Sequence, residues 1–345
     1  MVNVDPLAVL SFVSEGHLRL APCVRVTVYL DAVEPAEVTE YCDAALALLR
    51  SRLASYQSGS MARRAAITDK ANGIVASWFR RPREGQTYYA EFTGAGKEGT
   101  SPAELRIVVN YNPPQILSPD EIETRRERRR VLYEERGAKS TGPVSEITLT
   151  MPLDMEAAHP QRLLRWLLDR PLIAQTAFAS GHAGLGVNRD GLVADNALSA
   201  EINGRLAYAV VRHPGLDWQK NPILNEVMRY DSRSRDLVPQ IKRVNWLTFT
   251  SSRTLSALGP VEEITARIAS GPSVAIHPLR HGLLVQAGPE PALADTNTGD
   301  LPASYCHVGH VLRGWRLPTL TGEGPGFSDE LAQRWLTAFD AERAE

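Results

Sequence analysis

Apolar and polar residues alternate along several short runs of the chain, which is the pattern of half-buried strands. The first such run, residues 17–31, contains the β-branched sequence RVTVYL and predicts a strand. Four runs between residues 73 and 154 are separated by Gly- and Pro-bearing turns, which favours an antiparallel meander over alternating strand–helix units. Strands are predicted at residues 17–31, 73–81, 87–94, 104–113, 144–154, 172–188 (running into a glycine-rich turn), 241–250 and 273–288 (a hairpin).

Other segments repeat their apolar residues every three or four positions, as an amphipathic helix does. In residues 34–53, Pro35 suits a first helical turn, and the apolar stripe is formed by Val38, Cys42, Ala45, Leu49 and Leu53. Helices are predicted at residues 34–53, 118–137, 159–170, 198–215, 221–233, 254–270 (through Gly259 and Pro260), 303–313 and 328–344 (with Ser328 as N-cap).

Both halves of the chain mix strands with helices, and no low-complexity linker separates them. We therefore expect an α+β fold with a mixed, largely antiparallel sheet flanked by helices. One continuous body is expected, with two related lobes at residues 1–190 and 191–345.

Net charge, cysteine spacing and the length of apolar runs limit the classes of function that this protein can have. A net charge of −2 over 345 residues argues against a nucleic-acid binder that relies on whole-domain electrostatics, and equally against an acidic DNA mimic. The odd, widely spaced cysteines Cys23, Cys42 and Cys306 predict no disulfide framework. No signal-peptide pattern opens the chain, and nowhere do about 18 apolar residues run together, so we expect a cytoplasmic protein without a membrane span.

Asp295, Asn297, Gly299 and Asp300 have the alternate oxygen spacing of a calcium loop. However, the twelfth position is Cys306 instead of the expected Glu, and a strand-like run precedes the loop. A polar turn between hairpin and helix is the favoured interpretation. The glycine run at residues 181–186 lacks the order of a phosphate-binding loop, and His307 with His310 lacks further metal ligands, so no metal or cofactor site is predicted.

Two charged segments remain. Arg125 to Arg130 is surrounded by glutamates, which favours a solvated helix over a DNA contact. Glu34, Glu37 and Glu40 are spaced by three along the first predicted helix, with no Lys or Arg among them. Carboxylates stabilise a helix N-terminus in any case, but this patch is also the best candidate for contact with a basic partner.

Several ordered blocks in the second half carry a family resemblance. They are residues 181–188, 244–248 (VNWLT), 286–288 with Pro291, Asp295 and Asn297, then Leu301, Pro302 and Tyr305, and finally Trp335 with Phe339 and Asp340. Together they resemble the bacterial type VI secretion immunity family associated with VRR-NUC nuclease effectors. Ala294 stands where that pattern has Gly.

The resemblance implies an immunity protein that is not an enzyme, needs no cofactor, and neutralises a cognate nuclease effector by stoichiometric occlusion. It also implies that the signature residues are scaffold: Asn245, Trp246, Gly288, Pro291, Asp295, Trp335 and Phe339. Two alternatives stay open. One is a metal-assisted hydrolase that uses Asp295 and Asp300, and the other is a nucleic-acid-binding module that uses Arg125 to Arg130.

Overall fold

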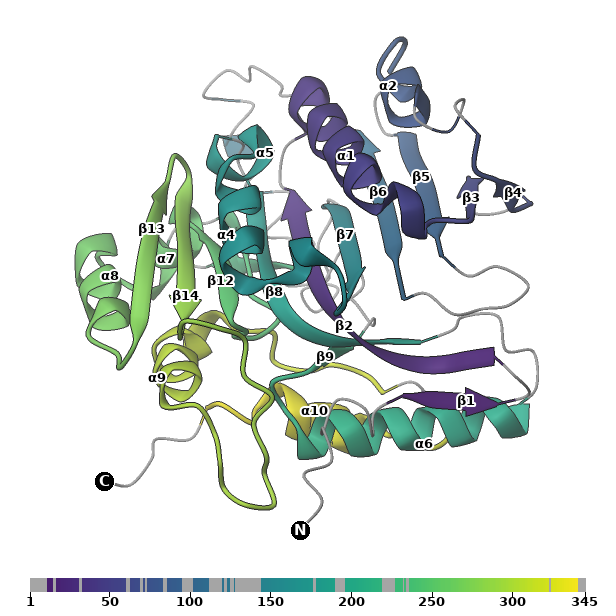
Figure 1. The fold of residues 1–345 in the computed structure, drawn as a ribbon. Helices are drawn as coiled ribbons and strands as arrows, with labels where there is room; N and C mark the ends of the chain where they lie inside the picture. The colour runs from purple at the N-terminus through teal and green to yellow at the C-terminus, as the bar shows by residue number, and fades with distance from the viewer. Residues whose placement is uncertain are drawn as a thin grey trace.

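A large antiparallel sheet forms the centre of the protein (Figure 1). The computed structural model describes residues 11–14, 17–30, 33–59, 63–68, 71, 73–82, 86–94, 102–111, 120, 123–124, 127, 144–175, 178–189, 196–218, 227–231, 233, 236–322 and 324–340. Within these residues the sheet has twelve strands, in the order β13-β14-β12-β8-β2-β7-β6-β5-β3-β4, with β1 paired to β2 and β9 to β8. Of its pairs, β8 with β9 is parallel and the others are antiparallel.

The strands vary from two residues to fourteen. Those of the large sheet are β1 (Phe12–Ser14), β2 (His17–Leu30), β3 (Ser55–Ser58), β4 (Ala65–Ala66), β5 (Gln86–Thr93), β6 (Glu104–Tyr111), β7 (Ser145–Pro152), β8 (Phe178–Arg189), β9 (Asp217–Trp218), β12 (Leu247–Ser251), β13 (Val274–Leu279) and β14 (Gly282–Ala287). A separate two-stranded sheet pairs β10 (Met228–Asp231) with β11 (Asp236–Pro239).

Helices cover the sheet, as Figure 1 shows for α1, α4 and α5 over its front face. The α-helices are α1 (Pro35–Leu49), α2 (Ile74–Trp78), α4 (Pro160–Leu168), α5 (Pro171–Ala174), α6 (Asn196–Arg212), α7 (Ser252–Leu258), α8 (Val261–Ala269), α9 (Ala303–Leu312) and α10 (Asp329–Leu336). Short 3-10 turns are η2 (Arg50–Arg52), η4 (Glu156–Ala158) and η6 (Arg313–Trp315). None of the helices within the described residues is long and apolar enough to cross a bilayer.

The central strand β2 sends alternate side chains to the two faces of the sheet. Val24, Val26, Val28 and Leu30 join the main apolar core with residues of α1, α4 and α5. Towards the start of β2 the same face continues into a second apolar cluster, which includes Leu20, Leu185, Trp218 and Trp335 and is closed by α6 and α10. Two apolar clusters therefore bury most of the helical face of the central strands.

Most of the predicted elements are confirmed. The meander of β5, β6 and β7 is antiparallel as expected, and the hairpin of β13 and β14 turns at Arg280 and His281. Pro35 opens α1, and the Ser328 hydroxyl caps α10 by accepting a hydrogen bond from the Leu331 amide at 3.3 Å. Cys23, Cys42 and Cys306 are buried and form no disulfide.

Two predictions confused strand with helix. Residues 73–81 contain the short helix α2 in place of a strand, because its two buried side chains, Val75 and Trp78, are three residues apart and lie on one helical face. Residues 228–231 form the strand β10 within a predicted helix, since they pair with β11. Residues 221–226 of that prediction, and most of 118–137 with the arginines at 125, 126 and 128–130, lie outside the described residues.

Three other predictions placed boundaries wrongly. The segment 254–270 is two helices, α7 and α8, because Gly259 and Pro260 end the first one. The strand predicted at 241–250 begins only at Leu247. Residues 172–188 start with α5, and β8 then runs straight through the predicted glycine-rich turn.

The sheet connects the two halves of the chain directly. β8, which ends just before residue 190, pairs with β2 of the first half and with β9 and β12 of the second. The division into two related lobes stays a prediction.

Candidate functional site

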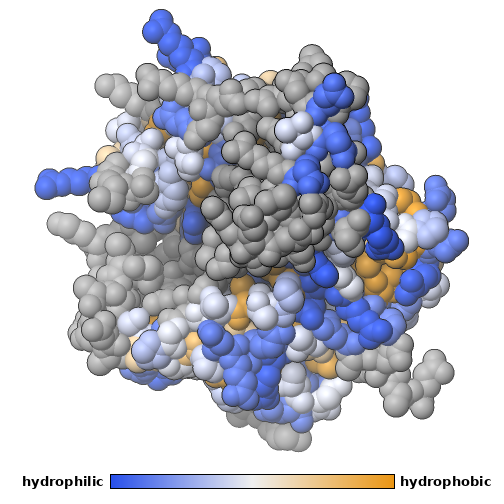
Figure 2. Space-filling view, turned by 180° about the vertical axis from the view of Figure 1, so that it is seen from behind, coloured by the Kyte–Doolittle hydropathy of each residue, from blue (hydrophilic) through white to orange (hydrophobic). Residues whose placement is uncertain are grey.

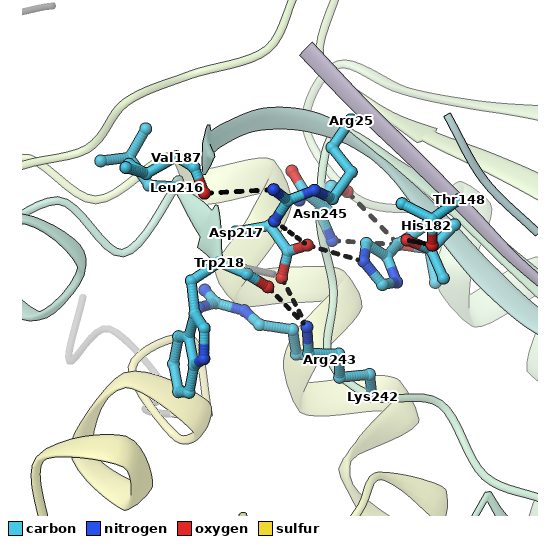
Figure 3. Close-up of polar contacts among 12 residues, drawn as sticks. Arg25, Thr148, His182, Val187, Leu216, Asp217, Trp218, Lys242, Arg243 and Asn245 are labelled. Carbon is cyan, nitrogen blue, oxygen red and sulfur yellow. Dashed lines mark hydrogen bonds and ion pairs between the residues drawn. The ribbon is translucent and has the colours of Figure 1, made fainter. Parts of the chain in front are cut away.

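A buried carboxylate, Asp217, organises the polar interior of the protein (Figure 3). It lies on β9, opposite Gly186 of β8. Its two oxygens contact three basic side chains: Lys242 Nζ at 2.8 Å, His182 Nε2 at 3.0 Å and Arg25 Nη1 at 3.6 Å. All four side chains are at most 1% exposed. Residues distant in sequence are thus joined by one anion in the core.

Burial and charge act against each other on these groups. Burial by itself raises the pKa of Asp217, but Lys242, His182 and Arg25 outweigh it and hold that pKa well below its usual range. Burial lowers the pKa of His182, and the opposing attraction of Asp217 does not restore it, so the imidazole is neutral near pH 7. The pKa of Lys242 is lowered chiefly by burial as well, against the pull of Asp217.

Arg243, the neighbour of Lys242, is buried against Trp335 of α10 and against Phe339, which follows that helix. Its guanidinium lies 3.9 Å from the ring centre of Trp335 and 4.7 Å from that of Phe339, and it donates a 2.5 Å hydrogen bond to the Pro214 carbonyl. Burial lowers its pKa to about 9. Trp335 also donates from Nε1 to the Leu216 carbonyl at 2.8 Å. The rings of Trp335 and Phe339 therefore pack against the buried guanidinium of Arg243.

The glycine block at residues 181–188 makes room for Asn245. A Cβ on Gly184 would collide with the Asn245 side chain, whose Oδ1 accepts a hydrogen bond from the Trp246 amide at 2.8 Å. The Asn245 amide in turn donates to Thr248 Oγ1 at 3.1 Å. These bonds hold the chain in its bend before β12. Gly184 lies within β8, opposite Arg25 of β2, and the close approach of Asn245 leaves no room there for a side chain.

Gly288 and Pro291 belong to the loop that joins β14 to α9. The Gly288 carbonyl accepts a hydrogen bond from Trp246 Nε1 at 3.1 Å, and its φ of +95° suits glycine. Next to Pro291, the Ala292 amide donates to the Tyr305 hydroxyl at 3.1 Å. Ala294 has a φ of +61°, a left-handed backbone conformation that glycine adopts more readily than alanine.

Asp295 and Asp300 close the polar end of the same loop. Asp295 Oδ2 pairs with Arg212 Nη2 at 3.1 Å, and Asp295 Oδ1 accepts from the Asn297 amide at 2.9 Å. The backbones of Asp295 and Asp300 bond to each other at 2.8 and 3.0 Å. The favoured prediction of a polar turn is confirmed, and the carboxylate faces a guanidinium of α6.

His213 lies against this loop, with its Nδ1 2.8 Å from the Ala294 carbonyl oxygen, but His277 and His307 bond elsewhere. His307 Nε2 bonds to the Arg267 carbonyl at 2.7 Å, and His277 Nε2 bonds to Gln286 Oε1 at 3.1 Å. Across the described residues, no three His, Cys, Asp or Glu side chains are placed to hold a metal ion.

The acidic residues predicted to contact a partner lie at the start of α1. Glu34 is exposed at the N-cap position. Glu40 Oε1 pairs with Arg170 Nη1 at 2.6 Å. Burial and the charge of Glu34 raise the pKa of Glu37, while the nearby Arg280 opposes the rise. The protein's own arginines thus offset part of this patch, and Glu34 is its most accessible carboxylate.

Comparison with known proteins identifies the family. A family described as type VI immunity for VRR-NUC (TsiV) matches residues 129–339, more than half of the chain. The chain belongs to the TsiV family. The expected family membership is thereby confirmed, and the matched range contains the seven residues that were predicted to be scaffold.

The TsiV-family fold also has a counterpart of known structure. The Pseudomonas aeruginosa T6SS protein PA0821 matches with a TM-score of 0.69 and 19% sequence identity, over 97% of this chain and 89% of that one. At this identity the likeness concerns the fold alone. No curated protein matches the chain.

Sequence reasoning missed the Asp217 cluster. One signal for it was present: Lys242 and Arg243 stand between the apolar residues Ile241 and Val244, in a run that was predicted to be a strand. Two adjacent cations within an apolar run need buried acceptors or an anion. The sequence could not indicate which acidic residue supplies the charge.

Proposed function

We propose that this TsiV-family protein is an immunity protein. In this proposal it binds a cognate type VI effector, a nuclease of the VRR-NUC type, and neutralises it by stoichiometric occlusion without chemistry of its own. The observation that carries the proposal is the family match over residues 129–339.

The contacts of the signature residues support this proposal. Asn245, Trp246, Trp335 and Phe339 are buried, and Asp295 is paired with Arg212. We propose that these residues, with Gly288 and Pro291, are scaffold. A protein that acts through its surface gains from a stiff frame, because a pre-organised surface loses less conformational entropy on binding.

The proposal also includes the acidic residues at the start of α1 as a contact for the effector. A protein that binds DNA presents basic groups to the phosphates, so Glu34, Glu37 and Glu40 would attract its binding surface. Because Glu40 is paired with Arg170, we assign most of this attraction to Glu34. The place of action follows from the target: an inhibitor that protects DNA from a nuclease works in the cytoplasm.

The test pairs binding with inhibition. Calorimetry and size-exclusion chromatography would measure complex formation with the effector encoded by the neighbouring reading frame, beside a DNA-degradation assay. We expect tight one-to-one binding that abolishes cleavage. An effector that is folded and active but unbound would reject the proposal. A metal that co-purifies with this protein and is lost in Asp295→Ala would favour the hydrolase alternative.

A charge reversal tests the acidic patch within the same assay. Glu34→Lys should slow association several-fold at low salt and leave dissociation nearly unchanged, because exposed charges act mainly on the encounter rate. Reversal of Glu34, Glu37 and Glu40 together without any change in inhibition would exclude the patch from the interface.

A further inference from the structure

An open groove lies on the helical face of the sheet, between the start of α4 and the loop that joins β14 to α9. Figure 1 shows α4 and this loop on the same side of β2 and β8. The groove has a cavity volume of about 680 Å³. Val24 of β2 and Leu185 of β8 line it, together with Leu153, Met155 and Pro291. The sheet supplies the floor, and the two walls come from distant parts of the chain.

Both walls are held in place by the fold. On one side, Pro289 and Pro291 restrict the backbone, and the Gly288 carbonyl accepts hydrogen bonds from Trp246 Nε1 and Gln286 Nε2, both at 3.1 Å. On the other side, η4 leads into α4, with Pro160 at its first turn. The groove is therefore largely formed before any partner arrives, which lowers the entropic cost of docking.

The groove also exposes apolar surface. Among the described residues, three large apolar side chains are exposed: Val13 at 58%, Leu153 at 36% and Tyr208 at 63%. Of these, Leu153 lines the groove. In the view from behind (Figure 2), the apolar residues of the described surface form separate small groups among hydrophilic ones. An apolar side chain at the edge of a concave site is typical of a docking position.

The charges at the rim favour a cationic occupant. Asp154 and Glu156 are 64% and 74% exposed, and they pair with Arg52 at 2.6 Å and Arg162 at 2.5 Å. Such exposed pairs contribute little stability, so a partner's cation can replace an internal one at small cost. Glu290 is exposed and adjoins the lining in sequence, next to Pro291, so it adds a third carboxylate near the rim, where Arg162 and His159 supply the basic side chains of the lining. A nuclease that binds DNA offers the complementary charge.

We propose that this groove receives a segment of the VRR-NUC effector in which a large apolar side chain is flanked by lysine or arginine. The proposal rests on the immunity function proposed above. The apolar side chain enters between Leu153 and Pro291, and the basic residue reaches the rim carboxylates. In this proposal the groove contact determines the dissociation rate of the complex, whereas the charge of Glu34 affects its association rate.

The test uses the full chain and the effector of the neighbouring reading frame, with binding followed by surface plasmon resonance. Leu153→Lys removes the apolar contact and opposes the partner's charge, and Glu290→Lys reverses a rim charge outside any internal ion pair of the described residues. The matched control is Val13→Lys, an exposed apolar-to-lysine change on β1, away from the groove lining. Thermal unfolding of each variant verifies its fold.

We expect Leu153→Lys to weaken binding by about tenfold or more through faster dissociation, and Glu290→Lys to weaken it several-fold. Val13→Lys should bind as the wild type does. Wild-type affinity in both groove variants, or equal losses in Val13→Lys, would overturn the groove proposal while leaving immunity intact. Failure of the wild-type protein to bind the folded effector would instead reject the proposed function, and the groove with it.

Discussion

The two faces of the central sheet are buried by opposite means. On the helical face, Val26 of β2 lies opposite Leu149 of β7, and both belong to the apolar core. On the other face, the adjacent Thr27 lies opposite Thr148, and their hydroxyls are 3.1 Å apart. All four side chains are at most 1% exposed. Alternation in a strand therefore does not imply that its polar face meets water.

The polar face depends on specific partners in a way that the apolar face does not. Apolar contacts are non-directional, so the helical face needs only volume and shape. Each buried polar group on the other face needs an acceptor, a donor or a counter-charge. Asp217 meets that need for Lys242 and Arg25. The following predictions test this difference.

The largest effect is expected for Asp217→Ala. The substitution leaves Lys242 and Arg25 buried without their anion, which should lower the free energy of unfolding by about 3–5 kcal/mol. Denaturant titration at pH 7 would measure it. Leu149→Ala on the apolar face is the matched deletion, expected to cost about 2–5 kcal/mol through its cavity. A cost below about 1 kcal/mol for Asp217→Ala would show that water reaches these charges.

A reciprocal pair of nearly isosteric changes in β2 compares the faces directly. Val26→Thr places a hydroxyl without a partner among apolar neighbours and should destabilise by about 1–3 kcal/mol. Thr27→Val should cost at most about 1 kcal/mol. The reason is that Thr148 keeps its 3.1 Å hydrogen bond to Glu146 Oε1. Equal costs for the two variants, measured by the same titration, would contradict the distinction between the faces.

The free energy of unfolding should depend on pH through the buried titratable groups of the polar face. An unfolded histidine takes up a proton near pH 6.5, whereas burial makes the folded His182 take it up only at lower pH. The unfolded state then binds more protons, so stability falls as the pH drops below about 6.5, by at most about 1.4 kcal/mol per pH unit for this group. The lowered pKa of Asp217 adds a loss of the same sign in stronger acid.

The histidine contribution can be separated by substitution. His182→Gln keeps a hydrogen-bonding side chain but cannot take up a proton, so its stability should depend less on pH between 5 and 6.5 than that of the wild type. Parallel curves for the two proteins would assign the acid sensitivity to other groups.

The sequence by itself determined the strongly periodic elements and the family. The alternation in residues 25–30 gave a strand, the stripe from Val38 to Leu49 gave α1, and the ordered blocks from residue 181 onward indicated the TsiV family. Each of these signals is local, because a period or a spacing is read within a few turns of chain.

The tertiary structure alone decided what lies between distant segments. From the sequence, Gly184 was predicted to lie in a turn, but it lies in a strand where Asn245 occupies the space beside it. Residues 228–231 were predicted to be helical, but they form a strand that pairs with β11. The partner of Lys242 and the groove between Leu153 and Pro291 were likewise beyond the sequence. The physical reason is common to all four: a close approach, a strand pairing, a buried ion pair and a concave surface are properties of pairs of segments that only folding brings together.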